Sequence, residues 1–179
     1  MMRILHKHIY WLSLLVFLMC CGDDEAEDPA ANEDDPSLEF TIGSDNFVAD
    51  FSGFNAAIIA TTNPGINWTS VTLGGSTTNG ETVSFVIAFD GKNTGTSTVS
   101  GAAGEDTNAP QGLSIALVVN NSGQVETITY EAVNMNIDIT NYVPISGITA
   151  EVAGTFSGTM RGDNGQQVSV SGSFKTGTL

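Results

Sequence analysis

Apolar and polar residues alternate along most of the chain after residue 37, and this alternation is the clearest structural signal in the sequence. In the segment 134–140, for example, Met135, Ile137 and Ile139 alternate with polar residues. Successive side chains of a strand point to opposite faces of a sheet, so a period of two predicts half-buried β-strands. The other predicted strands are 38–42, 47–50, 56–61, 66–73, 83–89, 113–119, 125–130, 152–160 and 168–174.

Turn-forming residues separate these segments, as at Asn79-Gly80, Asp90-Gly91 and Asn164-Gly165. Such pairs supply the positive φ angles that tight hairpin turns require. No segment shows a sustained helical period of 3.6 residues. We therefore predict an all-β fold, a single antiparallel β-sandwich or flattened barrel of about 8–10 strands. The alternation does not distinguish a sandwich from a barrel, because both produce it.

The first twenty residues have the pattern of a secretory signal peptide. Two basic residues, Arg3 and Lys7, precede an apolar run of eleven residues at 9–19. That run is too short to span a membrane, which takes roughly 20 apolar residues, but it is normal for a signal peptide. It leads into Leu18-Met19-Cys20-Cys21, which resembles a bacterial lipobox. The resemblance implies that the chain is cleaved after Cys20 and that Cys21 becomes the lipid attachment site, where several acyl chains make a stable anchor.

An acidic segment follows Cys21 and predicts where the anchored protein resides. Residues 22–37 contain many acids, two prolines and little to bury, so we expect a disordered tether. The acidic cluster directly after the anchor is similar to that of surface lipoproteins of Bacteroidota. We therefore expect a signal peptide at 1–20, an anchor and tether at 21–37 and one β-domain at 38–179. The expected location is the outer membrane, facing the cell surface or alternatively the periplasm.

Composition excludes several classes of function. With Arg3 and Lys7 in the signal peptide, the mature chain has three basic and twenty acidic residues, a net charge of −17. Nucleic-acid binding needs clustered Lys and Arg, so no nucleic-acid partner is expected. Both histidines lie before Cys21 and no other cysteine follows it. We therefore expect no His- or Cys-dependent catalysis, no cofactor and no metal site built from imidazole or thiolate.

The C-terminal segments carry a family resemblance. GTFSGTM at 154–160, a polar turn and VSVSGSF at 168–174 are similar to segments of an uncharacterised family of small Bacteroidota outer-membrane lipoproteins. Those proteins also have a lipobox, a polar tether and an early Phe-x-Ala strand, matched here by Phe47-Val48-Ala49. The family implies a fold and a location but no activity. Glycines on the apolar face predict close packing, with Phe156 and Phe174 filling the space that their neighbouring glycines leave.

Four features of the sequence are weak signals for chemistry. Arg161-Gly162-Asp163 is an integrin-binding tripeptide, but Gly-Asp-Asn-Gly is also an ordinary turn. Loops 90–93 and 105–108 contain oxygen ligands suited to Ca²⁺ without a complete calcium motif. Trp68, Tyr130 and Tyr142 form a sugar-stacking platform if they share an exposed face. The candidate carboxylates for glycoside hydrolysis are Asp50, Glu81, Asp90, Asp106, Glu126, Glu131, Asp138 and Glu151, and their spacing selects no pair.

The sequence therefore predicts a non-catalytic protein anchored to the membrane through Cys21. The β-domain is expected to bind an unidentified glycan or protein partner, or to serve a structural role. The alternative is a carrier that holds a small apolar ligand inside a β-barrel, because eight-stranded barrels can enclose one. A hydrolase with a carboxylate pair is the third hypothesis.

Overall fold

The fold is all-β, as the alternation predicted. The computed structural model describes residues 35–51, 57–62, 67–104, 111–121 and 124–177. The predicted signal peptide, Cys21 and nearly all of the predicted tether lie outside these ranges. Within them no helix is long and apolar enough to cross a membrane. The strands are β1 (Ser37–Ile42), β2 (Asp45–Asp50), β3 (Ala57–Thr62), β4 (Trp68–Thr77), β5 (Thr82–Asp90), β6 (Gly95–Gly101), β7 (Gly112–Asn121), β8 (Gln124–Pro144), β9 (Ala150–Gly162) and β10 (Gln167–Lys175).

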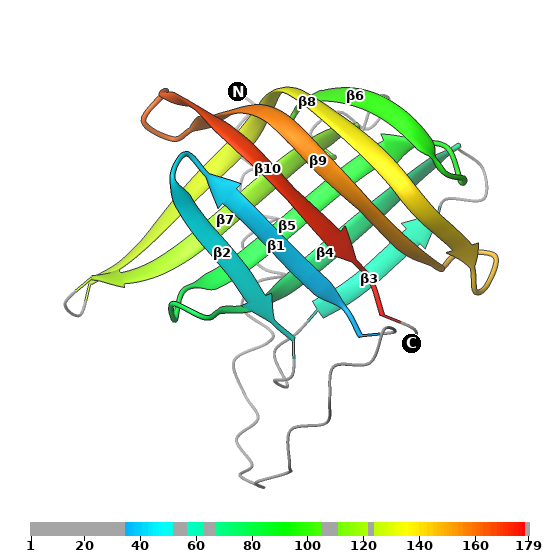
Figure 1. Cartoon of the computed structure of the whole chain (residues 1–179), viewed down its shortest axis with the longest axis horizontal. Helices are drawn as coiled ribbons and strands as arrows, with labels where there is room; N and C mark the ends of the chain where they lie inside the picture. The colour runs from blue at the N-terminus through cyan, green and yellow to red at the C-terminus, as the bar shows by residue number, and fades with distance from the viewer. Residues whose placement is uncertain (1–34, 52–56, 63–66, 105–110, 122–123, 178–179) are drawn as a thin grey trace, which may run out of the picture. The chain divides into compact units, whose positions relative to one another are not determined.

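Eight of these strands close into an antiparallel barrel (Figure 1). The pairing runs β2-β1-β10-β9-β8-β7-β5-β4, and β4 returns to β2 through Ala49↔Thr77 and Asp50↔Ser76. β3 pairs with β4 beside this closure, and β6 pairs with β8. The structure thus decides between the two predicted architectures in favour of the barrel.

The longest strand, β8, corrects the predicted boundaries. The sequence predicted separate strands at 125–130 and 134–140, whereas β8 runs without a break from Gln124 to Pro144. The register against β9 shifts between Ala132 and Asn134 and again between Ile139 and Asn141. A bulge inserts an extra residue and reverses the inward and outward alternation. The residues of β8 that face inward have even numbers before the first shift and odd numbers directly after it. The sequence pattern of this one strand therefore resembles that of two separate strands.

β6 was not predicted at all. Its sequence, GTSTVSG, has one apolar residue, Val99, which is 3% exposed. The remaining predicted strands agree with the observed ones apart from their end residues. Asp45 and Asn46 fall between the predicted strands 38–42 and 47–50, but they are paired in β2. Residues 63–65 and 105–110, which connect predicted strands, lie outside the described residues.

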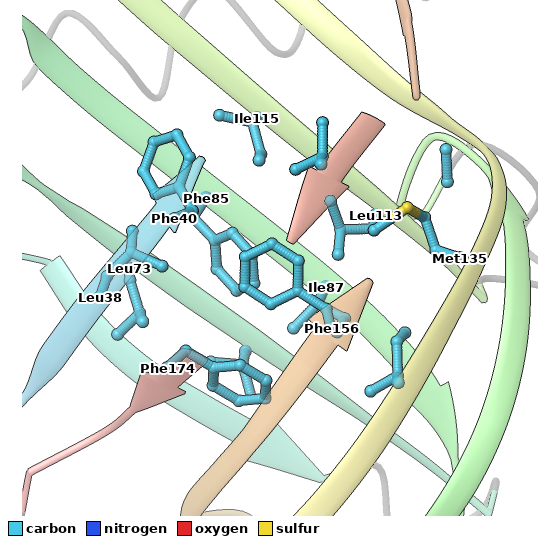
Figure 2. Packing of buried hydrophobic residues seen from close by; sticks show 14 of the residues in the cluster. Leu38, Phe40, Leu73, Phe85, Ile87, Leu113, Ile115, Met135, Phe156 and Phe174 are labelled. Carbon is cyan, nitrogen blue, oxygen red and sulfur yellow. The ribbon is translucent and has the colours of Figure 1, made fainter. Parts of the chain in front are cut away.

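The inside of the barrel is packed with apolar side chains (Figure 2). The rings of Phe85, Phe156 and Phe174 contact one another at its centre, with centroid distances of 5.1 Å from Phe85 to Phe156 and 5.5 Å from Phe85 to Phe174. Phe40 and Phe47 stack at 5.0 Å. All five rings are at most 8% exposed. These rings come from β1, β2, β5, β9 and β10, so they join opposite walls of the barrel.

Glycines make room for two of these rings, as the sequence predicted. Phe156 on β9 lies opposite Gly172 on β10, and Phe174 on β10 lies opposite Gly154 on β9. A Cβ atom on Gly172 would lie 2.7 Å from Cζ of Phe156, and one on Gly154 would lie 3.2 Å from Cε1 of Phe174. Each glycine therefore provides the volume that the opposing ring occupies.

Candidate functional site

A groove of about 250 Å³ lies at one end of the barrel, beside the end of β9. It forms because β8 continues past its partner: β9 pairs with β8 only as far as Tyr130↔Gly162 and then turns into β10. The β7–β8 hairpin meanwhile continues to Asn121↔Gln124 and projects away from the β9–β10 hairpin (Figure 1). The residues that line the groove are Glu126, Thr127, Ile128, Tyr130, Gly162, Asp163, Asn164, Gln166 and Val168.

The β9–β10 turn forms one wall of the groove, and local hydrogen bonds fix its shape. The Gly165 amide donates to the Gly162 carbonyl at 2.8 Å, and the Gln166 amide donates to Oδ1 of Asn164 at 2.9 Å. Gly165 has a φ of 79°, a conformation that favours glycine. The predicted Asp163-Asn164-Gly165 turn is therefore confirmed.

Asp163 joins this turn to β8. The Thr129 amide donates to Oδ2 of Asp163 at 2.7 Å, and the Asp163 amide donates to the Thr129 carbonyl at 3.1 Å. Asp163 thus provides hydrogen-bond partners for both the N–H and the C=O group of Thr129, at a position where β8 is no longer paired with β9. The carboxylate of the Arg-Gly-Asp tripeptide accepts a hydrogen bond from β8 of the same chain. The tripeptide is therefore explained by its structural role in the β9–β10 turn.

The floor of the groove is apolar and its rim is acidic. Tyr130 and Val168 are partly buried and pack against the core, and Ile128 lies beside them on the same face of β8. Burial raises the pKa of the Tyr130 hydroxyl above 10.0, and the carboxylates of Asp45 and Asp163 raise this pKa further. The lining includes two acids, Glu126 and Asp163, and no basic residue. The site therefore favours a cationic or hydrogen-bonding group over an anion.

The opposite end of the barrel presents apolar side chains at the end of β8 and on the β8–β9 loop. Val143 and Ile145 are each 47% exposed, and Ile148 is 59% exposed. Ser146 and Thr149 hold the loop, since their hydroxyl oxygens lie 2.7 Å apart and the Thr149 amide donates to Oγ of Ser146. This loop follows directly on paired β8 and β9, as Pro144↔Ala150 closes their ladder.

β1 begins at this same end. Ser37 pairs with Lys175 on β10, Lys175 pairs with Ala153 on β9, and Ala153 pairs with Asn141 on β8. These four residues form one row across neighbouring strands. The chain therefore enters the barrel at the end that bears the β8–β9 loop, whereas the groove lies at the other end of β8.

The three predicted platform residues do not share a face. Tyr130 and Tyr142 lie twelve positions apart on β8, roughly 40 Å along a strand. Tyr142 lies near the start of β4, where its hydroxyl is 3.3 Å from Oγ1 of Thr69, which itself donates to the Gly91 carbonyl. Trp68, the neighbour of Thr69, belongs to that end as well. A joint aromatic platform of all three is therefore ruled out.

Several predicted carboxylates serve local structure. Glu81 accepts a hydrogen bond from Thr77, Asp138 from Thr96 and Glu151 from Asn141. Asp106 and the loop at 105–108 lie outside the described residues. In the described part of the chain, no group of three or more His, Cys, Asp or Glu side chains could hold a metal ion.

Glu126 and Tyr130 are both candidate site residues in the sequence, but no sequence pattern predicts that they lie in one groove. The groove depends on β8 extending past β9, and no residue pattern gives the relative lengths of two strands. One signal was present: 125–130 and 134–140 alternate in opposite phase with only three residues between them, which is typical of a bulged continuous strand. Comparisons with protein-family models, with curated proteins and with solved structures found no match.

Proposed function

We propose that this protein is a lipid-anchored outer-membrane lipoprotein whose barrel binds a partner from outside. The observation that carries the proposal is the arrangement of the barrel. Its described interior is packed with contacting rings, and the groove lies at the end of β8 opposite to the point where the chain enters β1. A ligand would therefore bind at the groove end rather than among the central rings.

The division of features between the two ends supports this orientation. A tether from Cys21 would reach the barrel at Ser37, at the end that carries the exposed Ile145 and Ile148. Apolar side chains on a tight loop are suited to contact with a lipid surface. The acidic groove with Glu126 and Asp163 would then face away from the membrane. This is the arrangement that a surface-displayed binding protein requires.

The anchor is tested by two matched substitutions in the full-length chain. We expect Cys21→Ser to abolish incorporation of a radiolabelled fatty acid and to release the protein from the membrane fraction. Cys20→Ser is the control and should remain labelled and membrane-bound, because the lipobox-like pattern assigns lipid to Cys21. Retention of the label in Cys21→Ser would contradict the proposed anchor.

The membrane face is tested separately on intact cells. We expect added protease to degrade the lipidated protein while a periplasmic marker protein stays intact. Full protection of the protein until the outer membrane is permeabilised would contradict surface display and place the barrel in the periplasm.

A further inference from the structure

On one side of β8, next to the groove, the described part of the chain leaves backbone groups unpaired. Between Gln124 and Ile128, β8 pairs with β7 on one side, while the described residues provide no strand on the other side. An edge of this kind presents free N–H and C=O groups, and proteins generally cover such an edge or use it for binding. The turn at Asp163 covers it only at Thr129.

The ladder identifies which residues present these groups. Both backbone groups of Thr129 point away from β7, toward Asp163. Backbone groups alternate in direction along a strand, and the register shows no shift between 124 and 131. Val125 and Thr127 therefore direct their N–H and C=O groups to the free edge, while Gln124, Glu126 and Ile128 pair with β7. Asp163 occupies the place that the next strand would take.

The two faces beside this edge differ in chemistry. The side chain of Glu126 shares the groove face with Ile128 and Tyr130, and Asp163 closes this face. On the other face, Val125 is 70% exposed, the largest exposed fraction among the exposed large hydrophobic side chains that the structure describes. An added strand would thus meet an acidic and aromatic groove on one face and an aliphatic side chain on the other.

We propose that the β8 edge at Val125 and Thr127 binds a short extended peptide that places a Lys or Arg side chain in the groove. The inference deepens the proposed function and rests on it, because it takes the groove end as the binding end. Backbone pairing to Val125 and Thr127 supplies the main-chain contacts. The cation faces Glu126 and Asp163, and its aliphatic stem lies beside Ile128, the diagonal neighbour on the same face. A valine on the peptide's other face packs beside Val125.

Charge favours such a peptide over a second copy of the chain. After Glu39 the chain has eleven acids and three basic residues, a net charge of −8. Two copies paired edge to edge would bring their Glu126 side chains and acidic turns together. Like charges across paired strands are unfavourable, whereas opposite charges stabilise the pair.

The test uses the purified full-length protein in detergent micelles and fluorescein-labelled pentapeptides. The probe is Thr-Val-Lys-Val-Thr, acetylated and amidated at its ends, and Thr-Val-Glu-Val-Thr is its charge control. We expect fluorescence anisotropy to show binding of the Lys peptide at least about tenfold tighter than that of the Glu peptide. Equal affinities, or no binding of either peptide, would overturn the inference.

Methyl groups on the peptide test the backbone pairing without altering the protein. The proposed register puts both valines opposite Val125 and Thr127, with their N–H groups toward β8, and directs the lysine N–H away. N-methylation of the valines should therefore abolish binding, and N-methylation of the lysine should weaken it less than about threefold. The reverse order would refute strand addition at this edge.

Two variants at one position locate the site on the protein. Thr127→Pro removes an edge-facing N–H without removing a ladder hydrogen bond, so it should fold and lose binding. Thr127→Ala retains the N–H and should therefore bind the Lys peptide at least about tenfold more tightly than Thr127→Pro does. Glu126→Gln should reduce the difference in affinity between the Lys peptide and the Glu peptide. Unchanged binding in Thr127→Pro, or a concentration-dependent dimer that this variant abolishes, would overturn the inference.

A photo-crosslinking residue separates failure of this inference from failure of the proposed function. It is introduced at position 127 and, as a control on the same strand, at position 138 of the full-length chain on intact cells. Adducts at 127 alone, with no preference for the Lys peptide, would overturn the peptide inference and leave binding at the groove end standing. No adduct at either position, with no peptide bound, would overturn both.

Discussion

At the scale of single residues, the packing of the barrel depends on glycines that face phenylalanine rings. We predict that Gly172→Ala lowers the free energy of unfolding by about 1–3 kcal/mol, because the added methyl group would meet the Phe156 ring and the backbone of β1. Chemical denaturation measures this change. Gly147→Ala is the control, since a Cβ atom there meets nothing within 4 Å, and it should alter stability by less than about 0.5 kcal/mol. Equal stability of the two variants would contradict the described packing.

Tyr130 reports the electrostatics of the groove. We predict that Asp163→Asn lowers the pKa of the Tyr130 hydroxyl toward 10.0, because the substitution removes a neighbouring negative charge and leaves an oxygen to accept the Thr129 hydrogen bond. Tyrosinate absorbance in a Tyr142→Phe background follows this titration. Asp138→Asn, on the same strand, is the control and should leave the pKa unchanged. An unaltered pKa of Tyr130 in Asp163→Asn would refute the electrostatic effect of Asp163 on Tyr130.

The same pKa shift has a consequence for stability. The unfolded chain ionises this tyrosine near the ordinary pKa of 10.0, before the folded chain does. The unfolded state therefore binds fewer protons above that pH. The contribution of Tyr130 to the free energy of unfolding is complete below pH 10.0 and declines as the pH rises toward the pKa of the folded state. In Asp163→Asn this alkaline decline should be smaller.

At the scale of elements, the sequence predicted most strands but not their lengths. Strict alternation in 168–174 gave β10 almost in full, because no bulge interrupts the pattern. β8 resembled two strands in the sequence because its bulge near Val133 reverses the alternation of inward and outward residues. β6 escaped prediction because Val99 is its only apolar residue. The groove was not predictable, since it arises from the difference in length between β8 and β9 rather than from a pattern in either one.

β6 should be the least protected of the strands that pair with β8. It lies outside the closed ring and contributes only Val99 to the core, whereas β9 pairs with neighbours on both sides. We predict that the β6 amides paired to β8 exchange with deuterium at least about tenfold faster than the central amides of β9. Hydrogen exchange followed by mass spectrometry measures both. Equal protection would show that β6 opens only with the whole barrel.

At the scale of the whole molecule, the packed centre and the groove at the end opposite the chain's entry carry the functional account. A barrel can hold a small ligand only if its interior leaves room for one. Here Phe85, Phe156 and Phe174 meet across the centre, and the acidic groove lies at the end of β8. We therefore propose that this barrel binds a partner on its outside rather than a ligand in its interior.

Native mass spectrometry of residues 37–179, expressed in a bacterial host and purified without denaturation, tests this claim most directly. We expect the bare polypeptide mass, because contacting side chains occupy the described interior. A reproducible additional mass that is released on unfolding would contradict it. The barrel would then be a carrier, and the released molecule would identify its cargo.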